Sequence, residues 1–383
     1  MALPFIVLLV LFAAAPEVVR CCTPSDLQAL LAFKAGLKDP NFGVFSTWKG
    51  SECCSKWYGV SCDMSDGRVA GINLHGEAVD LDSSMLPRRV RFITGSISPA
   101  ICRLDRLSTF ILAYWRNISG PIPPCITSLS MLRIFDVVGN QLSGPIPGDI
   151  GRLSRLTVFS VADNQISDQI PRSLTNLASL MHLDLSNNRI TGDIPEPLTG
   201  TIPPSIGYME RLADLDLSVN RVSGTIPNTL GKMRVLSSVY LDCNALSGAI
   251  PPTLLSSHGL NILNLSRNAL EGTIPDVFIA QSYYTALDLS YNRLTGPVPK
   301  TLKLASYVGH LDLSNNNLCG QIPAGEPFDH LQSSSFANNH CLCGGRSEVP
   351  TLTPSISENT RRAKPSRLRR TTLDLTVRSR SDG

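Results

Sequence analysis

Five aspartates recur at one position of a repeated segment, and a row of carboxylates could act in acid-base catalysis or bind calcium. Asp184, Asp216, Asp288 and Asp312 share the spelling LDLS, and Asp136 takes the equivalent place. Side chains at one position of stacked segments lie about 5 Å apart and can be solvated or paired with Ser and Asn. Because LDLS is the consensus spelling of the repeat, we interpret the row as part of the scaffold. An acidic recognition stripe is the alternative.

The remaining reactive residues form no known catalytic signature. The sequence contains no HExxH, Walker A, GxGxxG or GxSxG motif, and its 6 His residues are scattered. Cys341 and Cys343 lie beside His340 and could form a metal site with it, but in a secreted chain we predict a cap disulfide there. The sequence therefore favours a protein that is not an enzyme and that needs no metal or cofactor.

The first residues and the cysteines indicate the secretory route. The apolar run FIVLLVLFAAA is typical of a signal peptide, which we place at residues 1–20. The 11 Cys residues are then expected to form disulfides, and their odd number predicts an unpaired thiol if all of them remain. Cys102 and Cys125 are a candidate pair, whereas Cys243 has no evident partner. No later stretch reaches the roughly 18 apolar residues of a membrane span, so we expect none.

An internal repeat provides the elements that must position these residues. Segments such as LMHLDLSNNRITGDIP and LNILNLSRNALEGTIP follow one template, LxxLxLxxNxLxGxIP. Its Asn falls at Asn140, Asn164, Asn188, Asn220, Asn244, Asn268, Asn292 and Asn316, and every step but one is 24 residues. This is the leucine-rich-repeat signature, and its LxGxIP half resembles the plant-type subclass.

Each repeat is expected to form one coil of a solenoid. The LxLxx segment predicts a short parallel strand whose Leu side chains enter the core, while the Asn can bond to backbone groups of the turn. In the second strand pattern Trp115 takes the Asn position, and that coil has 25 residues. The strand patterns together predict an α/β solenoid, a right-handed coil with a concave parallel β-sheet of about ten strands and disulfide caps.

The regions around the repeats differ from them in composition. The expected domains are a Cys-rich N-terminal cap at 21–65, the repeats at 66–318, a C-terminal cap at 319–345 and a disordered basic tail at 346–383. The cap segment SDLQALLAFKAGL has helical apolar spacing, with Ser25 as its N-cap. Residues 77–91 exceed the repeat length and predict a loop.

The tail holds most of the positive charge. From Arg346 onward there are 9 Lys and Arg against 4 Asp and Glu, a local charge of +5 within a formal total of +3. Such a segment could bind phosphates or cell-wall polyanions. It offers no aromatic platform, so we do not expect nucleic acid as a partner.

One step of the repeat is irregular. Asn188 and Asn220 are 32 residues apart, and between them ITGDIP is followed after a short interval by LTGTIP. The first hexapeptide is in register with the upstream Asn and the second with the downstream strand, and no strand pattern lies between them. We predict that one coil bulges near 193–200 while the strands on either side still stack. A sheet that breaks there would contradict this prediction.

The variable positions on the concave strands are the best candidates for recognition, because the solenoid fixes their geometry and leaves their identity free. These candidate protein-binding residues are Arg133, His182, Asp214, Tyr240, Arg267, Tyr291 and His310. Asn117 and Asn264 begin glycosylation sequons. A glycan on Asn264 would occupy part of the concave surface and move binding elsewhere.

Several stretches beyond the repeat carry a closer resemblance. CCSKWYGVSCD, LAYWRNISGPIPPCITSL and PFDHLQSSSFANNHCLCGG resemble the plant leucine-rich-repeat proteins of the DNA-damage-repair/toleration type, over roughly residues 21 to 345. Polygalacturonase-inhibiting proteins are more distant relatives. The resemblance implies disulfides that join Cys21 or Cys22 to Cys53, Cys54 to Cys62, and Cys319, Cys341 and Cys343 within the C-terminal cap. The family's cap closes on one more Cys after CLCG, which this chain lacks, so one thiol there is expected to have no mate.

These patterns together predict a secreted, non-enzymatic protein of the plant cell wall or apoplast that binds a protein or peptide ligand through its concave face and acts in defence or signalling. The partner would be a wall hydrolase or a receptor ectodomain. Inhibition of a microbial polygalacturonase is the first alternative function. DNA-damage toleration, which the family name suggests, is the second, and it conflicts with the signal peptide.

Overall fold

A computed structural model describes residues 22–40, 43–76, 92–191 and 202–344. The signal peptide, the 77–91 loop, the 193–200 bulge and the basic tail predicted from the sequence lie outside these residues. Every described helix and strand belongs to one compact unit.

The N-terminal cap is built on a helix and two disulfides. Helix α1 (Pro24–Ala35) begins after Thr23, whose side chain accepts a hydrogen bond from the Asp26 N–H at 3.3 Å. The prediction of Ser25 as the N-cap was wrong, because Pro24 lacks an N–H and suits the first helical position, which moves the cap two residues back to Thr23. The remaining cap elements are β1 (Leu37–Lys38), η1 (Val44–Thr47), α2 (Cys53–Lys56) and β2 (Val60–Cys62), with disulfides Cys22–Cys53 and Cys54–Cys62.

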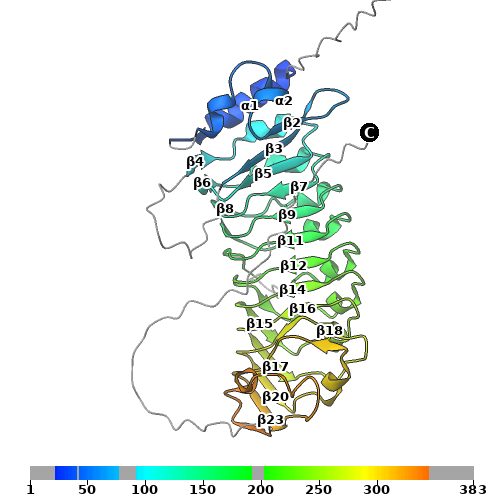
Figure 1. The fold of residues 1–383 in the computed structure, drawn as a ribbon. Coiled ribbons are helices and arrows are strands. Elements are labelled where there is room, and N and C mark those ends of the chain that lie inside the picture. Colours follow the sequence, from blue (N-terminus) through cyan, green and yellow to red (C-terminus); the bar gives the residue numbers. More distant parts are fainter. Residues whose placement is uncertain (1–21, 41–42, 77–91, 192–201, 345–383) are drawn as a thin grey trace, which may run out of the picture. The chain divides into compact units, whose positions relative to one another are not determined.

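The repeats form one continuous sheet, which we call the concave sheet. The ten predicted parallel strands are all present, in chain order, and β2 adds an antiparallel strand at the cap end. The ten are β3 (Val69–His75), β5 (Thr109–Ala113), β7 (Ile134–Asp136), β9 (Val158–Ser160), β11 (His182–Asp184), β12 (Asp214–Asp216), β14 (Ser238–Tyr240), β16 (Ile262–Asn264), β19 (Ala286–Asp288) and β22 (Leu311–Asp312). Figure 1 shows the strands from β3 to β16 stacked in this order, and the solenoid prediction is confirmed.

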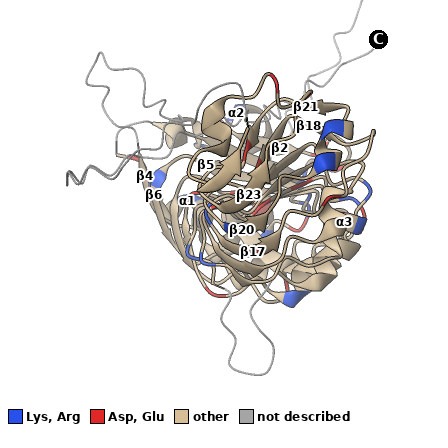
Figure 2. Ribbon diagram, turned by 90° about the horizontal axis from the view of Figure 1, so that it is seen from below, with Lys and Arg blue, Asp and Glu red and all other residues tan. Residues whose placement is uncertain are grey.

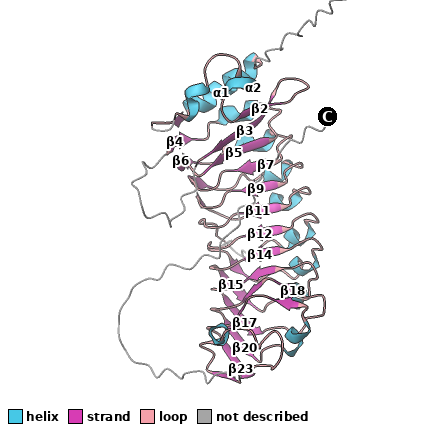
Figure 3. Ribbon diagram, in the orientation of Figure 1, coloured by secondary structure: helices cyan, strands magenta, loops and turns pink. Residues whose placement is uncertain are grey.

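Short strands and helices complete each coil behind this sheet (Figure 3). The strands are β4 (Ile93–Ser96), β6 (Arg116–Gly120), β8 (Gln141–Gly144), β10 (Gln165–Ile166), β13 (Ser223–Gly224), β15 (Ala245–Gly248), β17 (Ala269–Thr273), β18 (Tyr283–Tyr284), β20 (Arg293–Gly296), β21 (Tyr307–Val308), β23 (Asn317–Gln321) and β24 (Cys341–Cys343). The helices are η2 (Pro99–Arg103), η3 (Pro124–Ser128), η4 (Ile150–Arg152), η5 (Arg172–Asn176), η6 (Pro204–Tyr208), η7 (Leu230–Lys232), α3 (Pro252–Leu255), η8 (Lys300–Leu304) and η9 (Ser333–Phe336). Among the described helices, none is long and apolar enough to cross a membrane.

The irregular repeat leaves the concave sheet intact. Strand β11 pairs directly with β12, with His182 opposite Asp214 and Asp184 opposite Asp216. The prediction that the flanking strands still stack is therefore confirmed. The strands outside the concave sheet fall into three sheets: one ends at β10, one begins at β13, and β18 pairs with β21. Only an isolated parallel bridge, between Thr191 and Arg221, is described between the first two, whereas the concave sheet is continuous across this step.

The core is a column of Leu, Ile and Phe side chains between the two sides of the coils. The central residue of each concave strand is almost fully buried, as Leu183, Leu215 and Leu263 show. Phe110, Phe135 and Phe159 stack in three successive coils, with ring centroids 5.6 Å apart at each step. Each coil thus buries its apolar face against its neighbours, as a repeat that cannot close a core alone must do.

A ladder of Asn side chains satisfies the turns that follow the concave strands. The Asn164 amide donates to three carbonyls, including Val137 O of the preceding coil at 3.0 Å, and its Oδ1 accepts from the Leu142 N–H at 2.8 Å. Trp115 replaces Asn in the 25-residue coil, and its indole N–H donates to Leu74 O at 2.9 Å. The Trp thus supplies one of the donor bonds to the preceding coil that Asn makes elsewhere.

Two further disulfides join neighbouring coils. Cys102 pairs with Cys125, and Cys319 pairs with Cys341 in the C-terminal cap. Cys243 and Cys343 are unpaired in the part of the chain that the structure describes. The expected thiol without a mate in the C-terminal cap is therefore Cys343.

Candidate interaction surface

The residues on either side of each central strand residue form straight rows across the concave sheet; most are half-buried, and Ser160 and Asp216 are buried. One row runs from Ile134 through Val158 to His182 and Asp214, each opposite the next in the strand register. We call this the leading row. It continues through Ser238, Ile262 and Ala286. The second row, two residues further along each strand, contains the aspartates of the LDLS segments.

The second-row aspartates fasten the turn at the end of each strand. Oδ1 of Asp184 accepts hydrogen bonds from the Ser186 N–H at 3.0 Å and hydroxyl at 2.7 Å. Asp216 and Asp288 make the same pair of bonds, and Asn264 makes them with Ser266 at 3.0 and 2.8 Å. These bonds support the scaffold interpretation of the row.

The position of the second row also shifts the pKa of two of its aspartates. Burial raises the pKa of Asp136 and Asp288, because the charged carboxylate loses solvation next to other carboxylates. Within the described residues the acidic side chains form no group with metal-ligand spacing, and the one such group is the disulfide cysteines Cys22, Cys53 and Cys54. Calcium binding therefore has no geometric support here.

His182 and Asp214 are the first pair of sequence candidates that the fold brings together. Nδ1 of His182 lies 3.7 Å from Oδ2 of Asp214, an ion-pair distance that is too long for a hydrogen bond. The Asp214 carboxylate, helped by Asp184 and Asp216, raises the pKa of His182 against the opposing effect of burial. In turn His182 lowers the pKa of Asp214. Each side chain is about one third exposed (34% and 33%), so the pair is open to a partner.

Arg267 and Tyr291 are the second pair. Both lie in the turn after a concave strand, with left-handed backbone φ of 56° and 54°, where Asn, Asp or Gly would be easier to accommodate. The Arg267 guanidinium carbon lies 4.1 Å from the Tyr291 ring centroid. Such a cation-π contact holds two interface-prone side chains in one place on the surface.

The other three candidates are separate from these pairs. Arg133 and His310 are exposed at the starts of β7 and β22, and Tyr240 is half-buried at the end of β14. Sequence reasoning missed Tyr283 and Tyr307, which stack with centroids 4.9 Å apart on β18 and β21. Their positions 24 residues apart in the repeat could have revealed them.

The two sequon asparagines differ in setting. Asn264 is half-buried in the second row of the concave sheet, between Tyr240 and Asp288 in the register. Asn117 lies on β6 and its Oδ1 accepts a hydrogen bond from Gln141 at 3.1 Å. Glycosylation at either residue stays a prediction.

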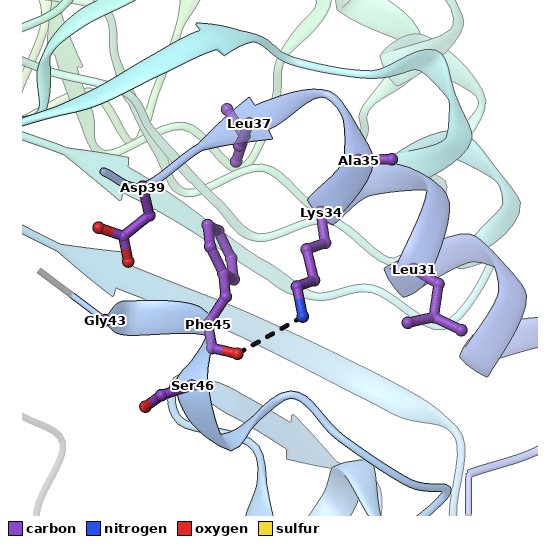
Figure 4. Close-up of a pocket in the computed structure, with 8 residues that line it drawn as sticks. All are labelled: Leu31, Lys34, Ala35, Leu37, Asp39, Gly43, Phe45 and Ser46. Carbon is purple, nitrogen blue, oxygen red and sulfur yellow. Dashed lines mark hydrogen bonds between the residues drawn. The ribbon is translucent and has the colours of Figure 1, made fainter. Parts of the chain in front are cut away.

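A hollow of about 530 Å³ lies in the N-terminal cap, away from the concave sheet. Figure 4 shows Lys34 reaching across it to the carbonyl of Phe45 at 3.5 Å, and Lys34 also donates to Trp48 O at 3.1 Å. Leu31 and Leu37 form its apolar wall. The lysine is thus used to satisfy the carbonyls of η1, and we assign the hollow no role.

Charge is distributed unequally between the two sides of the coils. Basic residues close several of the short outer helices, such as Arg152 in η4, Lys232 in η7 and Lys303 in η8. Figure 2 colours the Lys and Arg positions blue and the Asp and Glu positions red along the ribbon. Acidic residues instead recur on the concave strands.

Comparison with known proteins gives the family. A model described as "Leucine rich repeat N-terminal domain" matches residues 23–63, and "Leucine Rich Repeat" matches 131–153, 179–209, 259–280 and 308–325. Together with the ten stacked coils, these matches decide the assignment. The chain is a plant-type leucine-rich-repeat protein.

Two curated leucine-rich-repeat relatives cover part of the chain. "DNA damage-repair/toleration protein DRT100" of Arabidopsis thaliana is 52% identical over 144 residues, which is 37% of this chain and 38% of that protein. "Polygalacturonase inhibitor 1" of Oryza sativa subsp. japonica is 34% identical over 134 residues, which is 34% of this chain and 35% of that protein. The matched stretches thus span little more than a third of either relative.

Solved leucine-rich-repeat structures cover more of the chain. A plant ice-binding protein superposes with a TM-score of 0.70 at 27% identity, over 85% of this chain and 96% of that chain. The ectodomain of the Arabidopsis thaliana receptor kinase GASSHO1/SCHENGEN3, in complex with CASPARIAN STRIP INTEGRITY FACTOR 2, gives a TM-score of 0.70 at 32% identity, over 83% and 36%. The leucine-rich-repeat cap and its disulfides are those of an extracellular-type protein.

Proposed function

We propose that this leucine-rich-repeat protein is a secreted, non-enzymatic binder of a protein or peptide ligand in the plant apoplast or cell wall. The main observation in support of this proposal is the concave sheet, on which ten parallel strands hold variable side chains in fixed register. The Arg267–Tyr291 contact and the His182–Asp214 pair are the recognition features on it. A similar ectodomain was solved in complex with a factor bound to it, which supports this use of the fold.

The extent of the sheet agrees with this role. Ten strands at about 4.8 Å spacing extend for roughly 40 Å, which is ample for the roughly 800 Å² that each partner buries in a standard interface. The acidic second row opposes a nucleic-acid partner, because a phosphate backbone is bound through basic groups. A polypeptide partner is thus the better match to the described surface.

Capture from apoplastic fluid tests this proposal. The full chain and the double variant Arg267→Ala with Tyr291→Ala are immobilised side by side, and the captured proteins are identified by mass spectrometry. The control is Lys232→Ala with Lys303→Ala on the outer helices. We expect a partner that the wild type and the control retain and the concave variant loses. Equal recovery on all three would refute binding through this part of the concave face.

Inhibition of a microbial polygalacturonase is the second candidate, favoured by the relatives that are named as such inhibitors. Residual activity of a panel of purified fungal polygalacturonases, measured with and without the chain, tests it directly. Unchanged activity across the panel would count against this candidate and leave binding of another protein in place.

DNA-damage toleration is the third candidate and rests on the name of one relative. Localisation of a fluorescent fusion in plant cells tests it, because the secreted role predicts apoplastic signal and the DNA role predicts nuclear signal. The extracellular-type cap and the acidic concave strands favour the apoplast.

A further inference from the structure

The concave sheet changes character along its length, and one part of it combines apolar and acidic groups. In the leading row, Ile134 on β7 and Val158 on β9 are adjacent and only half-buried. We call these two residues the apolar step. Two β-branched side chains side by side on a solvent-facing sheet are unusual, because strands with one wet face carry polar residues there. The apolar step is immediately followed by His182 and Asp214.

The two strands that follow the apolar step, β11 and β12, carry most of the acidic side chains of this face. Across residues 133–136, 157–160, 181–184 and 213–216 there are four carboxylates and one Arg. The carboxylates belong to Asp136, Asp184, Asp214 and Asp216. Arg133 stands at the start of β7. A partner with basic side chains is therefore electrostatically complementary to this face, and an acidic one is repelled.

We propose that the face over β7, β9, β11 and β12 docks a basic, extended polypeptide segment of a partner protein. An apolar side chain of this segment packs on Ile134 and Val158, and a Lys or Arg pairs with the carboxylates around His182. This inference rests on the proposed function and specifies the chemistry of its partner. The interval from Val158 to Asp214 is two strand spacings, about 10 Å, which an extended chain covers in about three residues.

The fold offers a matched pair of variants for this site. Asp184→Asn removes the charge but keeps the turn, because Asn264 already makes the same two bonds from the same row. Asp288→Asn is the identical change in the identical turn, three strands beyond β12. For the apolar step, Val158→Thr has its control in Ile262→Thr, which lies in the same row on β16.

Selection of random dodecapeptides on the full chain, followed by affinity measurement of synthetic binders, tests the inference. We expect the binders to be enriched in Lys and Arg, with an apolar residue about three positions away. Asp184→Asn and Val158→Thr should each weaken binding by about tenfold, and Asp288→Asn and Ile262→Thr by less than about twofold.

Each other outcome is decisive. Acidic or uncharged binders would overturn the inference and leave the proposed function standing. Basic binders that respond equally to Asp184→Asn and Asp288→Asn would also overturn it, since charge alone and not this face would then explain them. If no peptide binds, the inference fails together with the proposed binding of peptides.

Discussion

The Asn ladder gives a sharp test of what holds the coils together. Asn164 and Asn140 lie in adjacent coils, are 9% and 7% exposed, and each donates three hydrogen bonds from its side-chain amide to backbone carbonyls. The two residues differ in whether the side-chain oxygen Oδ1 accepts a hydrogen bond. Oδ1 of Asn164 accepts from the Leu142 N–H, whereas Oδ1 of Asn140 has no partner among the described residues.

The difference follows from the 25-residue coil that precedes Asn140. This coil has one extra residue between Trp115 and Ile118, and Ile118 stands where Leu142 stands in the next coil. The Asn117 N–H bonds to Trp115 O at 2.8 Å, and no described N–H donates to Asn140 Oδ1, whereas the Leu142 N–H donates to Asn164 Oδ1. Asn140 is thus a natural comparison for Asn164, because its side-chain amide donates the same number of hydrogen bonds but its Oδ1 accepts none from the described residues.

The stability cost of Asn→Ala can be worked from these bonds. Loss of three donor bonds at about 0.5 kcal/mol each costs about 1.5 kcal/mol at either position. Asn164→Ala also leaves the buried Leu142 N–H without a partner, which adds about 2 kcal/mol. We expect losses of about 3.5 kcal/mol for Asn164→Ala and about 1.5 kcal/mol for Asn140→Ala.

Urea unfolding followed by circular dichroism measures both values on the full chain. The difference of about 2 kcal/mol between adjacent coils is the decisive quantity, because both changes remove the same atoms from the same environment. Losses that agree within about 0.5 kcal/mol would refute the idea that the acceptor bond to the preceding coil matters.

Three further predictions concern charge and thiols. Burial by itself would raise the pKa of Asp26, but hydrogen bonds from Arg68 and the Val69 N–H hold that pKa below its usual value. The ionised Asp26 therefore stabilises the folded state above about pH 4, and this stabilisation is lost as pH falls through the folded pKa. Arg68→Ala should lower the free energy of unfolding by about 3 kcal/mol at pH 7. In thermal unfolding, the difference in stability between the wild type and this variant should become smaller in acid. Thiol labelling of the native chain should modify the exposed Cys343 first, and Cys343→Ser should abolish that fast phase. In an NMR titration, His182 should titrate above its ordinary pKa, and Asp214→Asn should bring it down, because the carboxylate favours the imidazolium. An unchanged His182 would refute the pairing.

Much of the fold could be predicted because the same sequence pattern occurs in every repeat. The template LxxLxLxxN predicted each concave strand, since a Leu that alternates with exposed residues can be buried on only one face of a strand. The intact sheet across the 32-residue step from Asn188 to Asn220 was also predictable, because no strand pattern lies between them. The N-cap of α1 was misassigned to Ser25, because cap choice depends on where Pro24 places the first helical turn.

The candidate surface was only partly predictable. Exposed positions follow from the repeat, and all seven candidates lie on the concave strands or their turns. The sequence could not show that Arg267 lies over Tyr291, because that contact depends on side-chain rotamers and on the left-handed turn. The repeat places Ile134 and Val158 at outward-facing positions, but that they lie side by side and next to His182 depends on the register of the strands.

The sequence by itself determined the architecture, the number of coils and the position of each strand, because periodic burial of Leu is a local property that every repeat satisfies in the same way. The tertiary structure decided which side chains from separate coils become neighbours: Cys102 with Cys125, His182 with Asp214, and the apolar step with the carboxylates. The proposed recognition depends on those neighbours, and only the register of stacked strands about 4.8 Å apart brings residues 24 or 32 positions distant next to one another.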